Sequence, residues 1–98
     1  MWLLKTTEDA EAPFTFRILP GNIKTMGRSP GAEFVVDAAM VSRLHCRLTA
    51  GATELHVVDL ESTNGTFVNG QRITSTRLDE GDEITIGRTH AVFRPGKR

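Results

Sequence analysis

The chain has 98 residues and a mass of 10.8 kDa, which suits one domain and is too short for a two-domain enzyme with an interdomain cleft. Hydrophobic residues make up 39% of it, an ordinary globular fraction that excludes intrinsic disorder. Twelve Lys and Arg balance twelve Asp and Glu, so the chain lacks the basic surplus that holds a domain to nucleic acid or anionic lipid. We therefore expect one domain over residues 1–98, with no nucleic-acid or membrane partner.

Although the total charge is balanced, positive and negative residues are unevenly distributed along the chain. The net charge is −2 over residues 1–12, +3 over 13–49, −5 over 50–87 and +4 over 88–98. Such a division is typical of solvated faces of opposite sign, so any effect of charge on binding has to be local.

The single cysteine, Cys46, cannot form an intramolecular disulfide, and no closely spaced Cys/His set offers a zinc site. This pattern favours an intracellular compartment, cytoplasmic or nuclear, and predicts neither a metal nor a cofactor. The first residues lack a charged segment of the kind that opens a signal peptide, and no apolar run is long enough to span a membrane.

Turn-forming residues recur at short intervals and leave room for few long helices. They are Pro20-Gly21-Asn22, Ser29-Pro30-Gly31, Gly51, Asn64-Gly65, Asn69-Gly70, Glu80-Gly81-Asp82 and Pro95-Gly96. Several stretches between them alternate apolar and polar residues with the period of a strand that buries one face. The expected strands are Trp2–Thr6, Phe14–Ile18, Asn22–Met26, Phe34–Val36, a strand from about His45, Leu55–Val58, Thr66–Val68, Glu83–Ile86 and Ala91–Phe93. The pattern predicts an all-β, two-sheet sandwich of about 10 or 11 short strands.

The segment from Ala32 to Ala50 lacks Gly and Pro and also fits a helix with Ala38, Val41, His45 and Leu48 on one side. We favour a strand from about His45, because Leu44, Cys46 and Leu48 would then bury one face and continue into a β-rich half of the chain.

Three separated motifs occur in a distinctive order, and a turn with the start of a strand follows them. They are Gly27-Arg28, Ser42-Arg43-Leu44-His45 and Asp59–Gly70, followed by Gly81-Asp82-Glu83-Ile84. In this combination the chain resembles the forkhead-associated (FHA) domain over roughly residues 14–93. The resemblance implies a non-catalytic signalling module that binds a phosphothreonine peptide through loops at one end of the sandwich, and hence an upstream Ser/Thr kinase.

A phosphate monoester carries about −1.5 to −2 charge at neutral pH and is well matched by an arginine fork, hydroxyls and free N–H groups. Arg28 follows a glycine after an expected strand, which places its permanent charge where a strand enters a loop. The alternative role for Arg28 is a surface salt bridge with Glu33 or Asp37.

The Ser-x-x-His motif offers a further donor. Ser42 could donate its hydroxyl to a phosphate oxygen, as the resemblance implies, or could bond only to its own turn. Arg43 could contact the phosphate or the peptide backbone, or could face solvent.

Ser42, His45 and Asp59 are also the residue types of a catalytic triad. We do not favour catalysis, because no nucleophile elbow surrounds Ser42 and no oxyanion hole can be identified. The resemblance instead makes His45 a structural brace for the binding loops. His56 and His90 lack any motif and are expected on strand surfaces or in satisfied hydrogen bonds.

The loop Thr63-Asn64-Gly65 joins two expected strands. By resemblance, Thr63 contacts the phosphate and Asn64 bonds the ligand main chain, which suits an amide that both donates and accepts. Gly27 and Gly65 are assigned to the backbone shape that supports these loops. Asn69-Gly70 is expected to form a tight hairpin turn.

Partner selection is harder to predict. In the family, an apolar recess for the methyl group favours threonine over serine, and loops read the third residue after it. Met40 and Val41 could contact that residue or belong to the core, and Glu61 could favour a basic neighbour.

A rival function from another class keeps the fold but binds a phosphate-independent partner, or a second copy, through a sheet face or edge. The presence of Arg28, Ser42, Thr63 and Asn64 together argues against it. We expect a monomer, or one domain of a larger protein.

Overall fold

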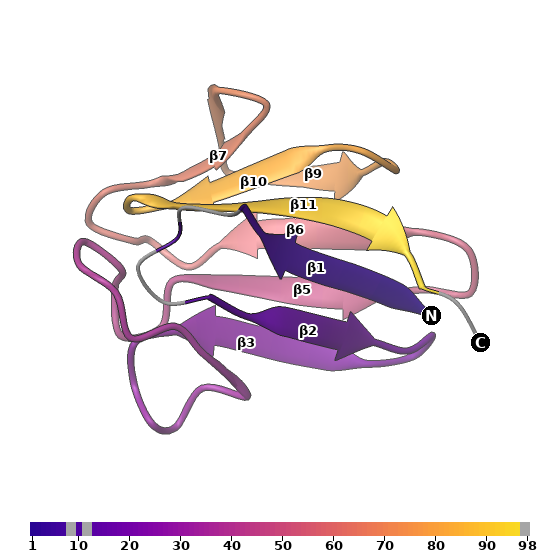
Figure 1. Ribbon diagram of the computed structural model, residues 1–98, viewed down its shortest axis with the longest axis horizontal. Coiled ribbons are helices and arrows are strands. Elements are labelled where there is room, and N and C mark those ends of the chain that lie inside the picture. The colour runs from indigo at the N-terminus through magenta and orange to yellow at the C-terminus, as the bar shows by residue number, and fades with distance from the viewer. Residues whose placement is uncertain (8–9, 11–12, 97–98) are drawn as a thin grey trace.

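The computed structural model describes residues 1–7, 10 and 13–96, and these form two packed β-sheets (Figure 1). The eleven strands are β1 (Trp2–Thr6), β2 (Thr15–Ile18), β3 (Ile23–Gly27), β4 (Phe34–Val35), β5 (Cys46–Ala50), β6 (Leu55–Asp59), β7 (Thr66–Val68), β8 (Gln71–Ile73), β9 (Ser75–Leu78), β10 (Glu83–Ile86) and β11 (Thr89–Pro95). The predicted all-β sandwich is confirmed.

One sheet has six strands in the order β2-β1-β11-β10-β7-β8, and the other has five in the order β4-β3-β5-β6-β9. Neighbouring strands are antiparallel except for β3 and β4, which pair in parallel through Met26↔Phe34 and Gly27↔Val35. This short parallel pair carries the chain from the end of β3 into a long loop before β5, and that loop contributes most of the candidate site.

The strand alternation predicted from the sequence places the core between the sheets. Leu4, Ile18, Met26, Leu48 and Val57 are fully buried, and each comes from a strand expected to bury one face. The rings of Phe14, Phe16 and Phe34 stack with centroid separations of 4.1 and 4.2 Å and close one side of this core. Burial of these apolar faces is the main source of stability for the framework that holds the loops.

Two strands, β8 and β9, were not predicted from the sequence. β8 has three residues, none of them fully buried, and β9 buries only Leu78, so neither shows the clear alternation of a core strand. Both lie at sheet edges, where hydrogen bonding to a single neighbour is enough to form a strand. The tight turn at Asn69-Gly70 is confirmed, because it joins β7 and β8 with positive φ angles of 51° and 83°.

The segment 32–50 forms no helix; it consists of β4, a loop and β5. One detail of its predicted pattern is wrong. The strand begins at Cys46, within one residue of the expected start, but Leu44 is 50% exposed whereas His45 is fully buried. The expected alternation fails here because His45 turns inward to bond two loops.

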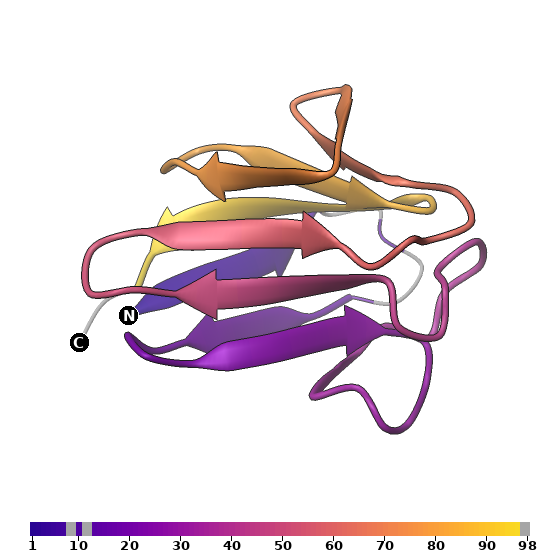
Figure 2. The ribbon, with the colours of Figure 1, turned by 180° about the vertical axis from the view of Figure 1, so that it is seen from behind.

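The long β4–β5 loop, the β6–β7 loop and the β10–β11 turn gather at one end of the sandwich (Figures 1 and 2). Met1 lies at the opposite end, where its carbonyl accepts the Gly96 N–H at 2.8 Å. The described part of the chain contains no helix long and apolar enough to cross a membrane.

Candidate functional site

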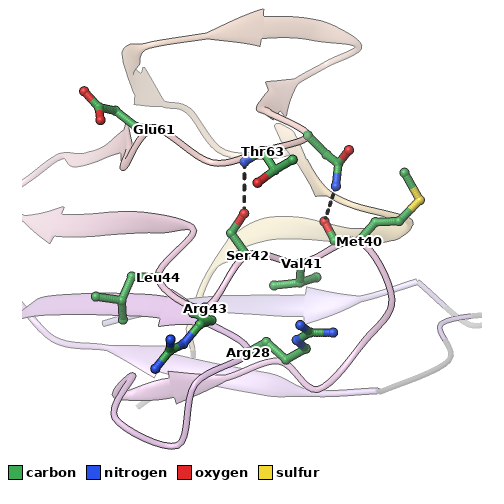
Figure 3. A pocket seen from close by; sticks show the side chains of 9 residues that line it. Arg28, Met40, Val41, Ser42, Arg43, Leu44, Glu61 and Thr63 are labelled. Atoms are coloured by element: carbon green, nitrogen blue, oxygen red, sulfur yellow. Dashed lines mark hydrogen bonds between the residues drawn. The ribbon is translucent and has the colours of Figure 1, made fainter.

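A pocket of about 480 Å³ lies among the loops at this end (Figure 3). Its lining comes from the end of β3, the β4–β5 loop and the β6–β7 loop. The lining residues are Arg28, Met40, Val41, Ser42, Arg43, Leu44, Glu61, Thr63 and Asn64. All five residues predicted to contact a ligand are therefore brought together, although they are separated by up to 36 positions in the chain.

Gly27 fixes the distance between two of the contributing segments. A Cβ at this position would lie 2.1 Å from the backbone oxygen of Arg43, so the approach is open only to glycine. The close contact extends the β3–β5 pairing into the loop, because Arg28 N–H donates to the Ser42 carbonyl at 2.9 Å and Ser29 N–H donates to the Arg43 carbonyl at 3.0 Å. The backbones of Arg28 and Ser42 are thereby held side by side.

Arg28 is an exposed cation with no ion pair to any other residue in the described part of the chain. Of its two expected alternative partners, Glu33 accepts the Thr25 N–H at 2.7 Å instead. A guanidinium without an internal carboxylate partner, at the edge of a pocket, is available to an anion from outside.

Ser42 joins the two loops that face each other across the pocket. Its hydroxyl oxygen accepts the Thr63 N–H at 3.0 Å (Figure 3). The expected alternative, a hydroxyl bonded only within its own turn, is therefore wrong. Because the hydroxyl accepts in this bond, its proton remains available to an acceptor in the pocket.

His45 braces the same loops from beneath. Its Nδ1 accepts the backbone N–H of Ser42 at 3.0 Å, which leaves the proton on Nε2 to be donated to the Gly65 carbonyl at 2.8 Å. Both ring nitrogens are thus occupied by backbone groups, and neither can take a proton from the Ser42 hydroxyl. The geometry is that of a structural brace and differs from a catalytic triad.

Burial lowers the pKa of His45 below its usual 6.5, and the bond to the Gly65 carbonyl and the charge of Asp59 only partly oppose this effect. The ring is therefore neutral at physiological pH, which its role as an acceptor from Ser42 requires.

Asp59 organises the other side of the β6–β7 loop, a role that the sequence analysis did not predict. One carboxylate oxygen accepts the hydroxyls of Ser62, at 2.5 Å, and Thr66, at 2.7 Å. Burial raises the pKa of Asp59, but the bonds from the Ser62 and Thr66 hydroxyls and from the Ser62 N–H lower it by more, so the net pKa is below its usual value. Ser62 in turn accepts the Gly65 N–H at 3.0 Å and sets the turn that presents Asn64.

Asn64 ties its own loop to the Met40 segment. Its amide nitrogen donates to the Met40 carbonyl at 3.0 Å, and this bond leaves the amide oxygen to accept from a ligand N–H. Met40 itself has a positive φ of 68°, an uncommon backbone conformation for a residue with a side chain. Gly87 packs beneath it, because a Cβ there would lie 2.7 Å from the Ala39 oxygen. No motif in the sequence predicted this contact with the β10–β11 turn.

The two apolar candidates of the Met40 segment both line the pocket but differ in burial. Val41 is 3% exposed and belongs to the core cluster, whereas Met40 is 46% exposed and presents its side chain at the pocket. Two other candidates from the sequence have surface roles. His56 lies 3.5 Å from Glu54, and His90 lies 3.0 Å from Glu83, so both are partnered on strand surfaces, as expected. In the described ranges no three His, Cys, Asp or Glu side chains are grouped as metal ligands.

A β-sandwich whose end loops gather two arginines, two hydroxyls and an amide around one pocket belongs to the class of loop-based peptide-binding modules that recognise anionic groups. The chain belongs to the forkhead-associated family, since the FHA domain model matches residues 24–87.

Among its relatives, the glycogen accumulation regulator GarA of Mycobacterium tuberculosis is 37% identical over 81 residues, which cover 83% of this chain and 50% of GarA. The chain thus spans about half the length of that relative.

Solved structures share the fold over almost the whole chain. An FHA domain solved in an analysis of phosphothreonine-dependent FHA domain interactions superposes with a TM-score of 0.87 at 28% identity, covering 99% of this chain and 98% of that one. Mycobacterium tuberculosis EmbR, solved in complex with a low-affinity phosphopeptide, gives a TM-score of 0.80 at 27% identity, covering 99% of this chain and 25% of EmbR.

Proposed function

We propose that this domain binds phosphothreonine-containing segments of partner proteins in the pocket of about 480 Å³ between the β4–β5 and β6–β7 loops. Arg28 supplies the charge that pairs with the phosphate, and Ser42 and Thr63 supply hydroxyl donors beside it. Asn64 holds the ligand main chain next to the phosphothreonine, and Arg43 adds a second positive charge at the rim. Gly27, His45 and Gly65 shape the loops without contacting the ligand.

This proposal rests on the exposed guanidinium of Arg28, which forms no ion pair with the residues that the structure describes. It lines the same pocket as the Ser42 hydroxyl, whose oxygen already accepts the Thr63 N–H. A carboxylate partner would neutralise the arginine, and a free hydroxyl would have to be oriented on binding. Here the hydroxyl is held by the Thr63 N–H, so the site is organised before the ligand arrives. The solved FHA domain linked to phosphothreonine-dependent interactions and the phosphopeptide complex of EmbR support the same ligand class.

The proposed role is recognition without catalysis. The ring nitrogens of His45 are occupied by Ser42 N–H and the Gly65 carbonyl, which supports this interpretation. The ligand then has to be generated by a separate Ser/Thr kinase. We place the domain in an intracellular compartment, because its single cysteine is a buried free thiol. We also propose that residues 1–98 act as one domain, whether as a monomer or within a longer protein.

The test is a calorimetric titration with a phosphothreonine peptide library, comparing wild type with Arg28→Ala and, as a matched control, Arg47→Ala. Arg47 is an exposed arginine of β5 that does not line the pocket. Loss of a charge-assisted contact costs about 2–5 kcal/mol, so Arg28→Ala should lower the affinity for the best peptide by at least tens of fold. Arg47→Ala should change that affinity by less than about threefold. Equal affinities of wild type and Arg28→Ala would show that Arg28 does not bind the phosphate.

A further inference from the structure

Leu44 is turned outward at a point where strand alternation would bury it. It is 50% exposed, while its neighbour His45 is fully buried. The reversal follows from the brace described above, because His45 has to face inward to bond Ser42 and Gly65. The same bonds that organise the pocket therefore hold a large apolar side chain at its rim.

A second depression, of about 460 Å³, adjoins the first. Ser29, Gly31, Arg43 and Leu44 line it, and the last two also line the first pocket. The two adjoining depressions are together called the groove. Its outer wall is rigid: Ser29 N–H donates to the Arg43 carbonyl at 3.0 Å, and the Ser29 hydroxyl accepts the Gly31 N–H at 3.1 Å. In that bond the Ser29 hydroxyl accepts, so its proton can still be donated, and Leu44 is the large apolar side chain among the lining residues.

The groove has exposed apolar side chains toward both sides of the arginine and hydroxyl centre. Figure 3 shows Met40 toward one side and Leu44 toward the other, with Ser42, Arg28 and Arg43 between them. Other exposed apolar residues, Leu19, Ile23 and Val35, line neither depression. Met40 and Leu44 are thus placed to contact different flanks of a peptide that crosses the centre in extended form.

We propose that Leu44, with Ser29, Gly31 and the aliphatic stem of Arg43, forms a subsite for one apolar side chain of the phosphopeptide, on the flank opposite to the one that contacts Met40. This inference rests on the proposed function. We expect an apolar occupant, because Arg43 is the one charged residue among the described residues of this lining and it also lines the first pocket, where the phosphate would engage it. Leu44 is two residues from Ser42, a backbone span of at most about 7 Å. An extended peptide advances about 3.3 Å per residue, so we expect the residue that contacts Leu44 within about four positions of the phosphothreonine.

The experiment uses phosphothreonine peptides that carry serine at all eight flanking positions, −4 to −1 and +1 to +4, and derivatives with leucine or glutamate at one position at a time. Affinities are measured for wild type, Leu44→Ser and the matched control Met40→Ser, which removes the other exposed apolar side chain of the groove. Both sites are half exposed, so both variants should fold, and unchanged melting temperatures would verify this.

For the wild-type domain, leucine at one position is expected to raise the affinity about fivefold or more over the all-serine phosphopeptide. A gain of this size matches partial burial of one leucine side chain. Leu44→Ser should reduce that gain to less than about twofold, whereas Met40→Ser should keep it. The proposal would be overturned if no position gave a leucine gain that Leu44→Ser removes and Met40→Ser keeps, or if glutamate were preferred at that position. Failure of the proposed function is distinguishable, because the all-serine phosphopeptide would then bind no better than its unphosphorylated form.

Discussion

Replacing Gly27 with alanine tests the claim that one close backbone approach builds the pocket. The added Cβ would lie 2.1 Å from the Arg43 carbonyl oxygen and 2.8 Å from its carbon, so the two backbone segments have to separate by about 1 Å. Overpacking of this kind costs about 1–3 kcal/mol, and weakening of the adjacent Arg28–Ser42 and Ser29–Arg43 bonds adds about 0.5–1.5 kcal/mol. We expect a total destabilisation of about 2–4 kcal/mol.

For a domain of this size, such a loss corresponds to a fall in melting temperature of about 10–25 °C, measurable by calorimetry or circular dichroism. The displacement also moves Arg28 relative to Ser42, so phosphopeptide affinity measured well below the melting temperature should fall about tenfold or more. The matched control is Gly51→Ala, because a Cβ at Gly51 makes only ordinary contacts of 3.6 Å and its φ is not positive. Gly27→Ala with the melting temperature and affinity of wild type would refute the reasoning.

Three further predictions concern the loops. Ser42→Ala should weaken phosphopeptide binding about tenfold, because it removes a hydroxyl donor and frees the Thr63 N–H, and calorimetric titration would expose an error if affinity stayed the same. Asn64→Ala should weaken binding about five- to thirtyfold by removing both the ligand amide contact and the bond to the Met40 carbonyl, and an unchanged dissociation constant would contradict this role. His45 has a lower pKa in the folded than in the unfolded state, so the free energy of unfolding should fall as the pH drops below about 6.5. It should fall again below about 3.8 as Asp59 is protonated. Denaturant midpoints that stay constant between pH 7 and 5 would show that His45 is not held neutral.

Much of the framework was predictable because its sequence pattern is local. Strands such as Trp2–Thr6 and Thr66–Val68 coincide with their predicted bounds, since alternation and flanking turns identify a strand without knowledge of its neighbours. β8 and β9 were not predictable in this way, because they are held by pairing at sheet edges rather than by an apolar face.

The residues that gather around the candidate pocket could also be selected in advance, because an ordered set of motifs marked Arg28, Ser42, Arg43, Thr63 and Asn64. The long-range hydrogen bonds and backbone contacts that arrange these residues could not be predicted from the sequence. The bond from Thr63 N–H to Ser42 spans 21 positions, and the contact between Gly87 and the Ala39–Met40 backbone joins a hairpin turn to a distant loop. The outward position of Leu44 has the same origin, because the tertiary bonds of His45 override the local alternation.

The most direct test of the central claim compares one peptide sequence in three forms by calorimetric titration against the wild-type domain: phosphothreonine, phosphoserine and unphosphorylated. We predict micromolar binding of the phosphothreonine form, weaker binding of the phosphoserine form and none of the unphosphorylated form. Affinity for the phosphothreonine form should also decline between about pH 7 and 5 as the phosphate takes up its second proton. Binding that is indifferent to phosphorylation would contradict recognition at the Arg28 pocket and move the interaction to another surface of the sandwich.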